Sequence, residues 1–214
     1  MTRNESCVLY FPSPLNHAQF SELLAGFSPE DAERVMNAYE FAKEAHRGQW
    51  RRDGVRYFEH PKAVAAILLQ LGVRDADTIC AALLHDVVED CSVALSQIEA
   101  RFGARVARLV KLVTKTGLSE RKYFARLVYA NEPGAWEVKL ADRLHNLSTL
   151  TSDPGNQAWC NQKKLEQVFE TRSSVMTIAA LLRACSGNQQ FGVWFQYQLE
   201  LWCVQRWNEV CLST

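Results

Sequence analysis

Residues 81–90 have the sequence AALLHDVVED, an apolar run that ends in four ionisable groups. In an α-helix, residues four apart share a face, which pairs His85 with Glu89. The same spacing pairs Asp86 with Asp90 on the neighbouring face. Burying carboxylates among leucines and valines is costly unless a cation or hydrogen-bond donors compensate. We therefore predict a metal site at the end of this helix.

Two other segments support this metal site. His60 stands at an expected helix start, just before a proline. The segment KLADRLHN (139–146) is expected to be helical, with Asp142 and Asn146 on one polar face beside a stripe of leucines. Two imidazoles and two carboxylates from these segments form a neutral complex with a divalent cation. They also leave positions open for water and for a phosphate oxygen.

Helical periodicity runs through nearly the whole chain, without an alternating strand pattern or an internal repeat. Ser28 followed by Pro29 is typical of a helix start. Residues 48–59 are polar, basic and glycine-containing, and we expect a loop there. The sequence predicts an all-α bundle of about ten helices. After a first long helix from residue 29, helices are expected at 60–71, 75–90, 94–102, 104–114, 119–130 and 135–150, followed by two long stretches broken near 186–188.

Composition excludes several classes of protein. The 24 Lys and Arg residues balance 24 Asp and Glu among 214 residues, so we expect no nucleic-acid partner. The seven cysteines occur singly, which favours a reducing compartment. Neither a signal-peptide pattern nor a run of eighteen apolar residues occurs. We therefore expect a cytoplasmic protein that does not enter a membrane.

Four segments of the chain follow the order and spacing of one known family. They are AHRGQWRRDGVRYFEHP (45–61), ALLHDVVED (82–90), ARFGARVARLVKLVTK (100–115) and VKLADRLHNLSTL (138–150). With these segments, residues 33–183 resemble the hydrolase domain of the RelA/SpoT-homologue family, within the HD-domain phosphohydrolases. The resemblance implies the helical fold of an HD domain.

The resemblance also implies a domain plan. The HD-type alarmone hydrolase domain is expected at residues 30–185, after an N-terminal extension of residues 1–29. Residues 186–214 are expected to form a C-terminal helix that packs on the bundle. Residues 193–207 are apolar on most sides, which favours burial against the bundle. A subunit interface, and with it a homodimer, is the alternative.

The chemistry implied by the resemblance is that of a small alarmone hydrolase. Such an enzyme removes the 3′-pyrophosphate from the nucleotide (p)ppGpp or from its adenosine analogue (p)ppApp. One divalent metal ion, manganese, is the expected cofactor. The implied metal ligands are His60, His85, Asp86 and Asp142.

Two further sets of residues match functional positions of the family. Glu89 and Asp90 match an acidic pair beside the metal, and their expected role is to orient the attacking water and move its proton. The implied substrate-binding residues are Arg51 and Arg52 near the phosphates, Tyr57 with its ring close to the base, and Asn146 and Thr149 in the nucleotide pocket.

Three positions around the expected pocket depart from the family. Arg52 stands where lysine is usual, Arg56 where proline is usual, and Ser148 where arginine is common. Because these positions surround the pocket, they leave the choice between guanine and adenine open.

Two other functions remain as alternatives. A phosphatase acting on another 2′- or 3′-phosphorylated nucleotide, such as NADPH, would release inorganic phosphate. A non-catalytic alarmone sensor would bind the nucleotide without turnover, but the intact ligands and acidic pair argue against it. His46 and His145 are expected to support the site rather than bind metal, and the role of Arg121 and Lys122 is left open.

Overall fold

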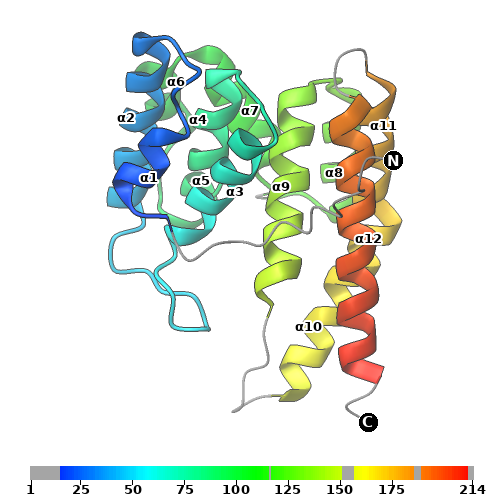
Figure 1. Ribbon diagram of the computed structural model, residues 1–214. Helices are drawn as coiled ribbons and strands as arrows, with labels where there is room; N and C mark the ends of the chain where they lie inside the picture. The colour runs from blue at the N-terminus through cyan, green and yellow to red at the C-terminus, as the bar shows by residue number, and fades with distance from the viewer. Residues whose placement is uncertain (1–14, 116, 151–156, 186–188, 212–214) are drawn as a thin grey trace, which may run out of the picture.

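The computed structural model describes residues 15–115, 117–150, 157–185 and 189–211 (Figure 1). Within these ranges no strand forms, and the prediction of an all-α fold is confirmed. The helices in chain order are α1 (His17–Glu22), α2 (Pro29–Ala45), α3 (Glu59–Gln70), α4 (Ala76–Leu84), α5 (Val87–Asp90), α6 (Leu95–Phe102), α7 (Ala104–Val113), α8 (Glu120–Tyr129), α9 (Pro133–Thr149), α10 (Gln157–Glu170), the π-helical turn η1 (Thr171–Val175), α11 (Met176–Ala184) and α12 (Gln189–Cys211).

Helix α9 is the central element of the bundle. It contacts α3, α4 and α7 on one side and α10, α11 and α12 on the other, as Figure 1 shows. Its first turn lies very close to α4, because a Cβ atom added to Gly134 would collide with the Thr78 hydroxyl. The Trp136 indole is buried and donates to the backbone oxygen of Leu127 at 2.8 Å. The side chains of α9 therefore meet both halves of the molecule.

The first helices pack as their sequence predicts. The Ser28 hydroxyl accepts a hydrogen bond from the Asp31 amide at 3.1 Å, which caps α2 above Pro29. Phe20 of α1 is buried, and its ring lies 5.0 Å from that of Tyr39. The ring of Tyr39 in turn lies 4.8 Å from Phe58, at the start of α3. The expected boundary between residues 29 and 30 stays a prediction.

One helix that we predicted as continuous is interrupted in the structure. We expected a single helix over residues 75–90, but α4 ends at Leu84 and α5 begins at Val87. The physical cause is the His85 side chain, whose Nδ1 lies 2.8 Å from the Ala82 carbonyl oxygen. In an unbroken helix that oxygen accepts the amide four residues on, so the imidazole competes for it. The break turns the chain where the expected metal ligands stand.

The C-terminal helices cover the far side of α9. Helix α12 contacts α9, α10 and α11. Its Arg206 donates from Nε to the Leu147 oxygen at 2.7 Å and from Nη2 to the Ser148 oxygen at 3.0 Å. A cation here satisfies carbonyl groups that the last turn of α9 leaves unpaired. None of the helices formed by the described residues combines the length and the apolarity that crossing a bilayer requires.

Candidate active site

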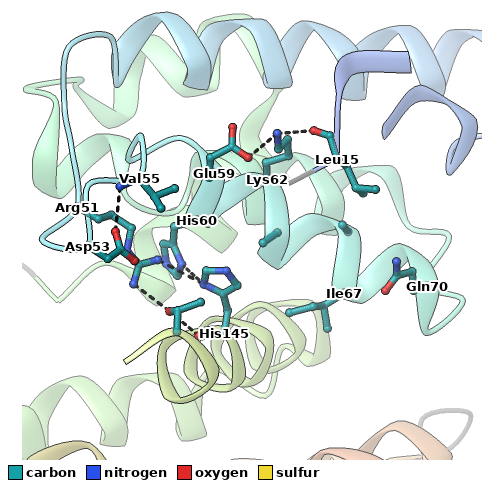
Figure 2. Close-up of a pocket in the computed structure, with 13 residues that line it drawn as sticks. Leu15, Arg51, Asp53, Val55, Glu59, His60, Lys62, Ile67, Gln70 and His145 are labelled. Atoms are coloured by element: carbon teal, nitrogen blue, oxygen red, sulfur yellow. Dashed lines mark hydrogen bonds and ion pairs between the residues drawn. The ribbon is translucent and has the colours of Figure 1, made fainter. Parts of the chain in front are cut away.

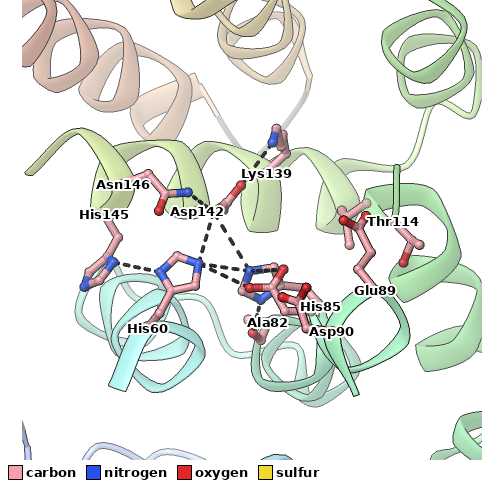
Figure 3. Close-up of polar contacts among 12 residues, drawn as sticks. His60, Ala82, His85, Glu89, Asp90, Thr114, Lys139, Asp142, His145 and Asn146 are labelled. Carbon is pink, nitrogen blue, oxygen red and sulfur yellow. Dashed lines mark hydrogen bonds and ion pairs between the residues drawn. The ribbon is translucent and has the colours of Figure 1, made fainter. Parts of the chain in front are cut away.

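The four predicted metal ligands lie together where α3, the α4–α5 break and α9 meet (Figure 3). His60 Nε2 lies 3.2 Å from His85 Nε2 and 3.2 Å from Asp142 Oδ1. His85 Nε2 lies 3.2 Å from Asp86 Oδ1. Neighbouring donors bound at about 2.0–2.2 Å to one ion would stand roughly 3–3.5 Å apart. The spacing therefore fits a shared cation, and His60, His85 and Asp86 form a group able to hold one.

Both imidazoles direct an unprotonated nitrogen at this centre. A carbonyl oxygen can only accept, so His85 Nδ1 carries the hydrogen that it shares with Ala82 at 2.8 Å. His60 Nδ1 lies 2.8 Å from His145 Nδ1, which the Arg51 guanidinium also approaches at 3.4 Å. Because Arg51 only donates, the shared His145 nitrogen is the acceptor and His60 is the donor. In neutral His60 and His85, Nε2 is then a lone pair beside carboxylate oxygens, a set of acceptors that calls for a cation.

The charges around the centre favour a positive charge there. Burial lowers the pKa of His60, which keeps that imidazole neutral. Burial alone would raise the pKa of Asp142, but the Lys139 ammonium, 3.0 Å from Oδ2, and the imidazoles hold it well below its usual range. Burial also opposes charge on His85, yet the carboxylates of Asp86 and Asp142 outweigh it and raise its pKa. The site therefore keeps its carboxylate charged and favours positive charge at its centre.

The predicted acidic pair stands beside the ligands. The Tyr57 hydroxyl lies 2.7 Å from Asp90 Oδ2 and 2.9 Å from Asp86 Oδ2. The Tyr57 ring is stacked on the His46 imidazole at 4.7 Å, so one of its faces is already covered. The predicted position of this ring close to the base stays a prediction. Glu89 accepts from the backbone amide of Lys115, which ties α5 to the segment after α7.

A cavity of about 480 Å³ opens over the ligands and the acidic pair. Its floor is acidic, and four basic residues besides Arg51 line it: Lys115, Lys139, Arg143 and Lys163. Sequence analysis gave these four no role. Lys139 and Arg143 had a local signal, since they stand on the same helix as Asp142, three residues before it and one residue after it. Lys163 belongs to α10, and nothing in the sequence near it indicates which helix it faces.

Three predicted substrate-binding residues meet at Arg51, which lines this cavity together with Asn146, whereas Thr149 lines the neighbouring one. Arg51 Nη2 lies 3.2 Å from Thr149 Oγ1 and 3.4 Å from Asn146 Oδ1. Asn146 also donates to Asp142 Oδ1 at 2.6 Å, which links the cluster to the metal ligands. Arg52 is exposed and lies outside the described residues that line the cavity, and the same holds for Arg121 and Lys122. The segment between α2 and α3 is therefore connected to the expected metal ligands through Arg51.

A second cavity, of about 310 Å³, lies on the other side of the Arg51 contacts (Figure 2). His60 and His145 form one wall, and Val55 and Ile67 belong to its largely apolar lining. The loop that bounds it is held by an isolated antiparallel bridge between Trp50 and Arg56. The two cavities share Arg51 and His60. A polar and a largely apolar space thus adjoin the same metal centre.

Comparison with known proteins defines the class. The family model described as an HD domain matches residues 38–137. This range includes the first three predicted ligands and ends just before Asp142. The all-helical fold and the cluster of imidazoles and carboxylates agree with that match.

Similar proteins identify the family within the class of HD-domain proteins. A guanosine-3′,5′-bis(diphosphate) 3′-pyrophosphohydrolase of Aquifex aeolicus is 44% identical over 136 residues, which are 60% of this chain and 19% of that protein. The protein of the same description named MESH1 in Homo sapiens is 38% identical over 153 residues, 68% of this chain and 84% of that protein. The chain thus spans about a fifth of the first relative and most of the second. It belongs to the RelA/SpoT-homologue family of HD-domain proteins, as the sequence predicted.

A solved structure supports the same assignment. It is described as a metazoan ortholog of SpoT that hydrolyzes ppGpp, and it aligns with a TM-score of 0.62 at 27% sequence identity. The alignment covers 81% of this chain and 95% of that chain. The shared fold therefore extends over most of this chain.

Proposed function

We propose that this chain is a metal-dependent hydrolase that removes the 3′-pyrophosphate from (p)ppGpp or (p)ppApp. The products would be pyrophosphate and the 5′-di- or triphosphate of the nucleoside. One observation carries the proposal: Nε2 atoms of His60 and His85 lie 3.2 Å apart and 3.2 to 3.9 Å from carboxylate oxygens of Asp86 and Asp142, in a pocket lined with basic side chains. The names of the relatives supply the substrate class.

The donor set fits a divalent cation, and we propose manganese. Two neutral imidazoles and two carboxylates also suit zinc or iron, so the choice of manganese rests on the family resemblance. When bound, the cation would activate water and polarise a phosphate oxygen. His145 would hold the His60 imidazole in the required tautomer, and the Ala82 carbonyl would do the same for His85.

The acidic pair would handle the water. In this proposal Asp90 and Glu89 orient the attacking water and accept its proton. The Tyr57 hydroxyl, 2.7 Å from Asp90 Oδ2 and 2.9 Å from Asp86 Oδ2, would fix the direction of both carboxylates. This role replaces the contact with the base that the sequence suggested for Tyr57. The contacts on both its hydroxyl and one ring face support the change.

The surrounding side chains would bind the nucleotide. Basic residues such as Lys115 and Lys163 line the 480 Å³ cavity, where phosphate groups would bring the matching negative charge. We propose that Arg51, Asn146 and Thr149 contact the nucleoside at the edge of this cavity. Arg52 would contribute from the exposed loop. The balanced charge of 24 basic and 24 acidic residues supports a small nucleotide rather than nucleic acid as the partner. The singly placed cysteines support a location in the cytoplasm.

The test is a product analysis on purified protein supplied with Mn²⁺. We expect pyrophosphate from guanosine tetraphosphate, or from its adenosine analogue, and loss of turnover in Asp86→Ala with the helical content unchanged. Inorganic phosphate from NADPH in place of pyrophosphate would instead support the phosphatase. Tight nucleotide binding without any product would support the sensor.

A further inference from the structure

The exposed apolar residues of this protein are concentrated on one surface. Among the described residues, nine large hydrophobic side chains are exposed, and six of them lie on α10 and α12. Each of the six is between 39% and 60% exposed. Single exposed apolar residues are ordinary, but a contiguous group marks an interaction site. We call these six residues the C-terminal stripe: Phe169, Val193, Tyr197, Leu201, Val204 and Trp207.

The stripe follows the outer face of α12, which stands at the edge of the bundle in Figure 1. With 3.6 residues per turn, its five members on this helix fall within an arc of roughly 120°. The opposite face of α12 holds Phe195, Leu199 and Cys203, all fully buried against the bundle. Phe169 extends the stripe onto α10, because its ring contacts that of Trp207 at 6.1 Å. Helix α12 therefore has two apolar faces, one that packs on its own chain and one that is exposed.

Charge is nearly absent from this face. Among the described exposed positions of this arc, one residue is charged, namely Glu200. Its carboxylate forms an ion pair with Arg172 at 2.7 Å. A surface meant for solvent usually carries charged residues at about 25–35% of its positions. A face that lacks them suits a partner that is equally apolar, such as the same face of a second copy.

The area of the stripe is what a dimer of this kind needs. Three aromatic side chains of about 150–250 Å² each, roughly half exposed, supply on the order of 300 Å². The three aliphatic side chains raise this to roughly 500 Å². A standard interface buries about 800 Å² per partner, of which about 60% is apolar, or roughly 480 Å². The polar rim of the contact can supply the remainder.

We propose that the C-terminal stripe joins two copies of this chain as an antiparallel pair of α12 helices. A two-fold axis between Leu201 and Val204 places each of these residues against the other in the second copy. Glu200 then faces Gln205 of the second copy. In a parallel pair Glu200 would face its own copy, and like charges at that distance repel. The inference is independent of the proposed activity.

The first test is the mass of the wild-type protein in solution, measured by sedimentation or light scattering over a range of concentrations. We expect a dimer that Leu201→Glu combined with Val204→Glu dissociates, raising Kd by at least about 30-fold. Both positions are exposed, so circular dichroism should show unchanged helical content. Tyr129→Glu is the matched control, since Tyr129 is 85% exposed on α8 and should leave the dimer intact.

The second test fixes the direction of the helices by oxidation. Antiparallel packing leaves the two exposed Cys211 thiols roughly 25 Å apart along the axis, beyond the ~7 Å reach of a disulfide. We therefore expect no covalent dimer through Cys211, and a covalent dimer when Leu201→Cys is combined with Val204→Cys. A monomer at every concentration, or a dimer that survives the double glutamate variant, would overturn the proposal. Crosslinking of the wild type that Cys211→Ser abolishes would overturn the antiparallel arrangement.

Discussion

Helix α9 carries two buried carboxyl groups whose surroundings have opposite effects. Glu137 lies near Asp75 and Arg105, and burial together with the charge of Asp75 raises its pKa to about 7. Asp142 is also buried, but Lys139 and the imidazoles of the site hold its pKa well below the usual range. Burial therefore favours the neutral form of a carboxyl group, and a nearby negative charge adds to this effect. A buried carboxylate that stays ionised needs cationic groups placed around it, and such an arrangement marks the site.

The largest effect is expected from Asp142→Asn. This variant keeps the shape of the side chain and removes the charge that faces both imidazoles, so turnover should fall by at least about 1000-fold. Activity on guanosine tetraphosphate with Mn²⁺ measures it, and circular dichroism checks that the bundle is intact. Activity within tenfold of wild type would show that Asp142 is not part of the metal site.

Glu137→Gln should change stability without changing the chemistry of the site. The folded pKa of Glu137, about 7, lies above its unfolded value, so the native state binds more protons and stability falls as pH rises from about 4.5 to 7. The glutamine variant loses this dependence and should be more stable than wild type by roughly 2–3 kcal/mol at pH 8. Urea unfolding at pH 4.5 and pH 8 tests this. An equal difference at both pH values would contradict the assignment.

Lys139→Met should lower the activity by removing a positive charge next to the expected metal ligand Asp142. Lys139 lies 3.0 Å from Asp142 Oδ2 and keeps that carboxylate ionised and oriented. We expect kcat/KM to fall about 10–100-fold, as for other groups that support a metal ligand. Lys139→Arg retains the charge and should recover part of the loss. If both variants behave alike, packing rather than charge is what Lys139 contributes.

Tyr57→Phe should have the smallest effect and separates two roles. The variant keeps the stack on His46 but removes the hydroxyl that contacts Asp86 and Asp90. Loss of one such hydrogen bond should lower kcat by about 2–10-fold and leave KM nearly unchanged. Tyr57→Leu, which also removes the ring, serves as the comparison. A raised KM in the leucine variant with an unchanged kcat in the phenylalanine variant would instead support the base contact suggested by the sequence.

The metal centre could be predicted from the sequence because each ligand is a residue type that an apolar helix does not otherwise bury. His85 and Asp86 within an apolar run required compensation, and the structure places His60 and Asp142 beside them. The ends of most helices followed from local signals such as Ser28 and Pro29. The roles of His60, His85, Asp86 and Asp142 as metal ligands stay predictions until metal binding is measured.

Other features depend on contacts between distant segments. The helix break at His85 arises from a side chain that bonds its own backbone, and helical periodicity does not reveal that choice. The contacts of Tyr57 need His46 from α2 and Asp90 from α5 in the same place. Lys163 lines the cavity because α10 packs across α9, an arrangement that no local pattern near Lys163 encodes.

The most direct test of the account is a metal titration of the chelated protein that follows pyrophosphate release from guanosine tetraphosphate. We predict no release without metal, full recovery at one equivalent of Mn²⁺, and no recovery in Asp142→Asn. Undiminished release in excess chelator would contradict it.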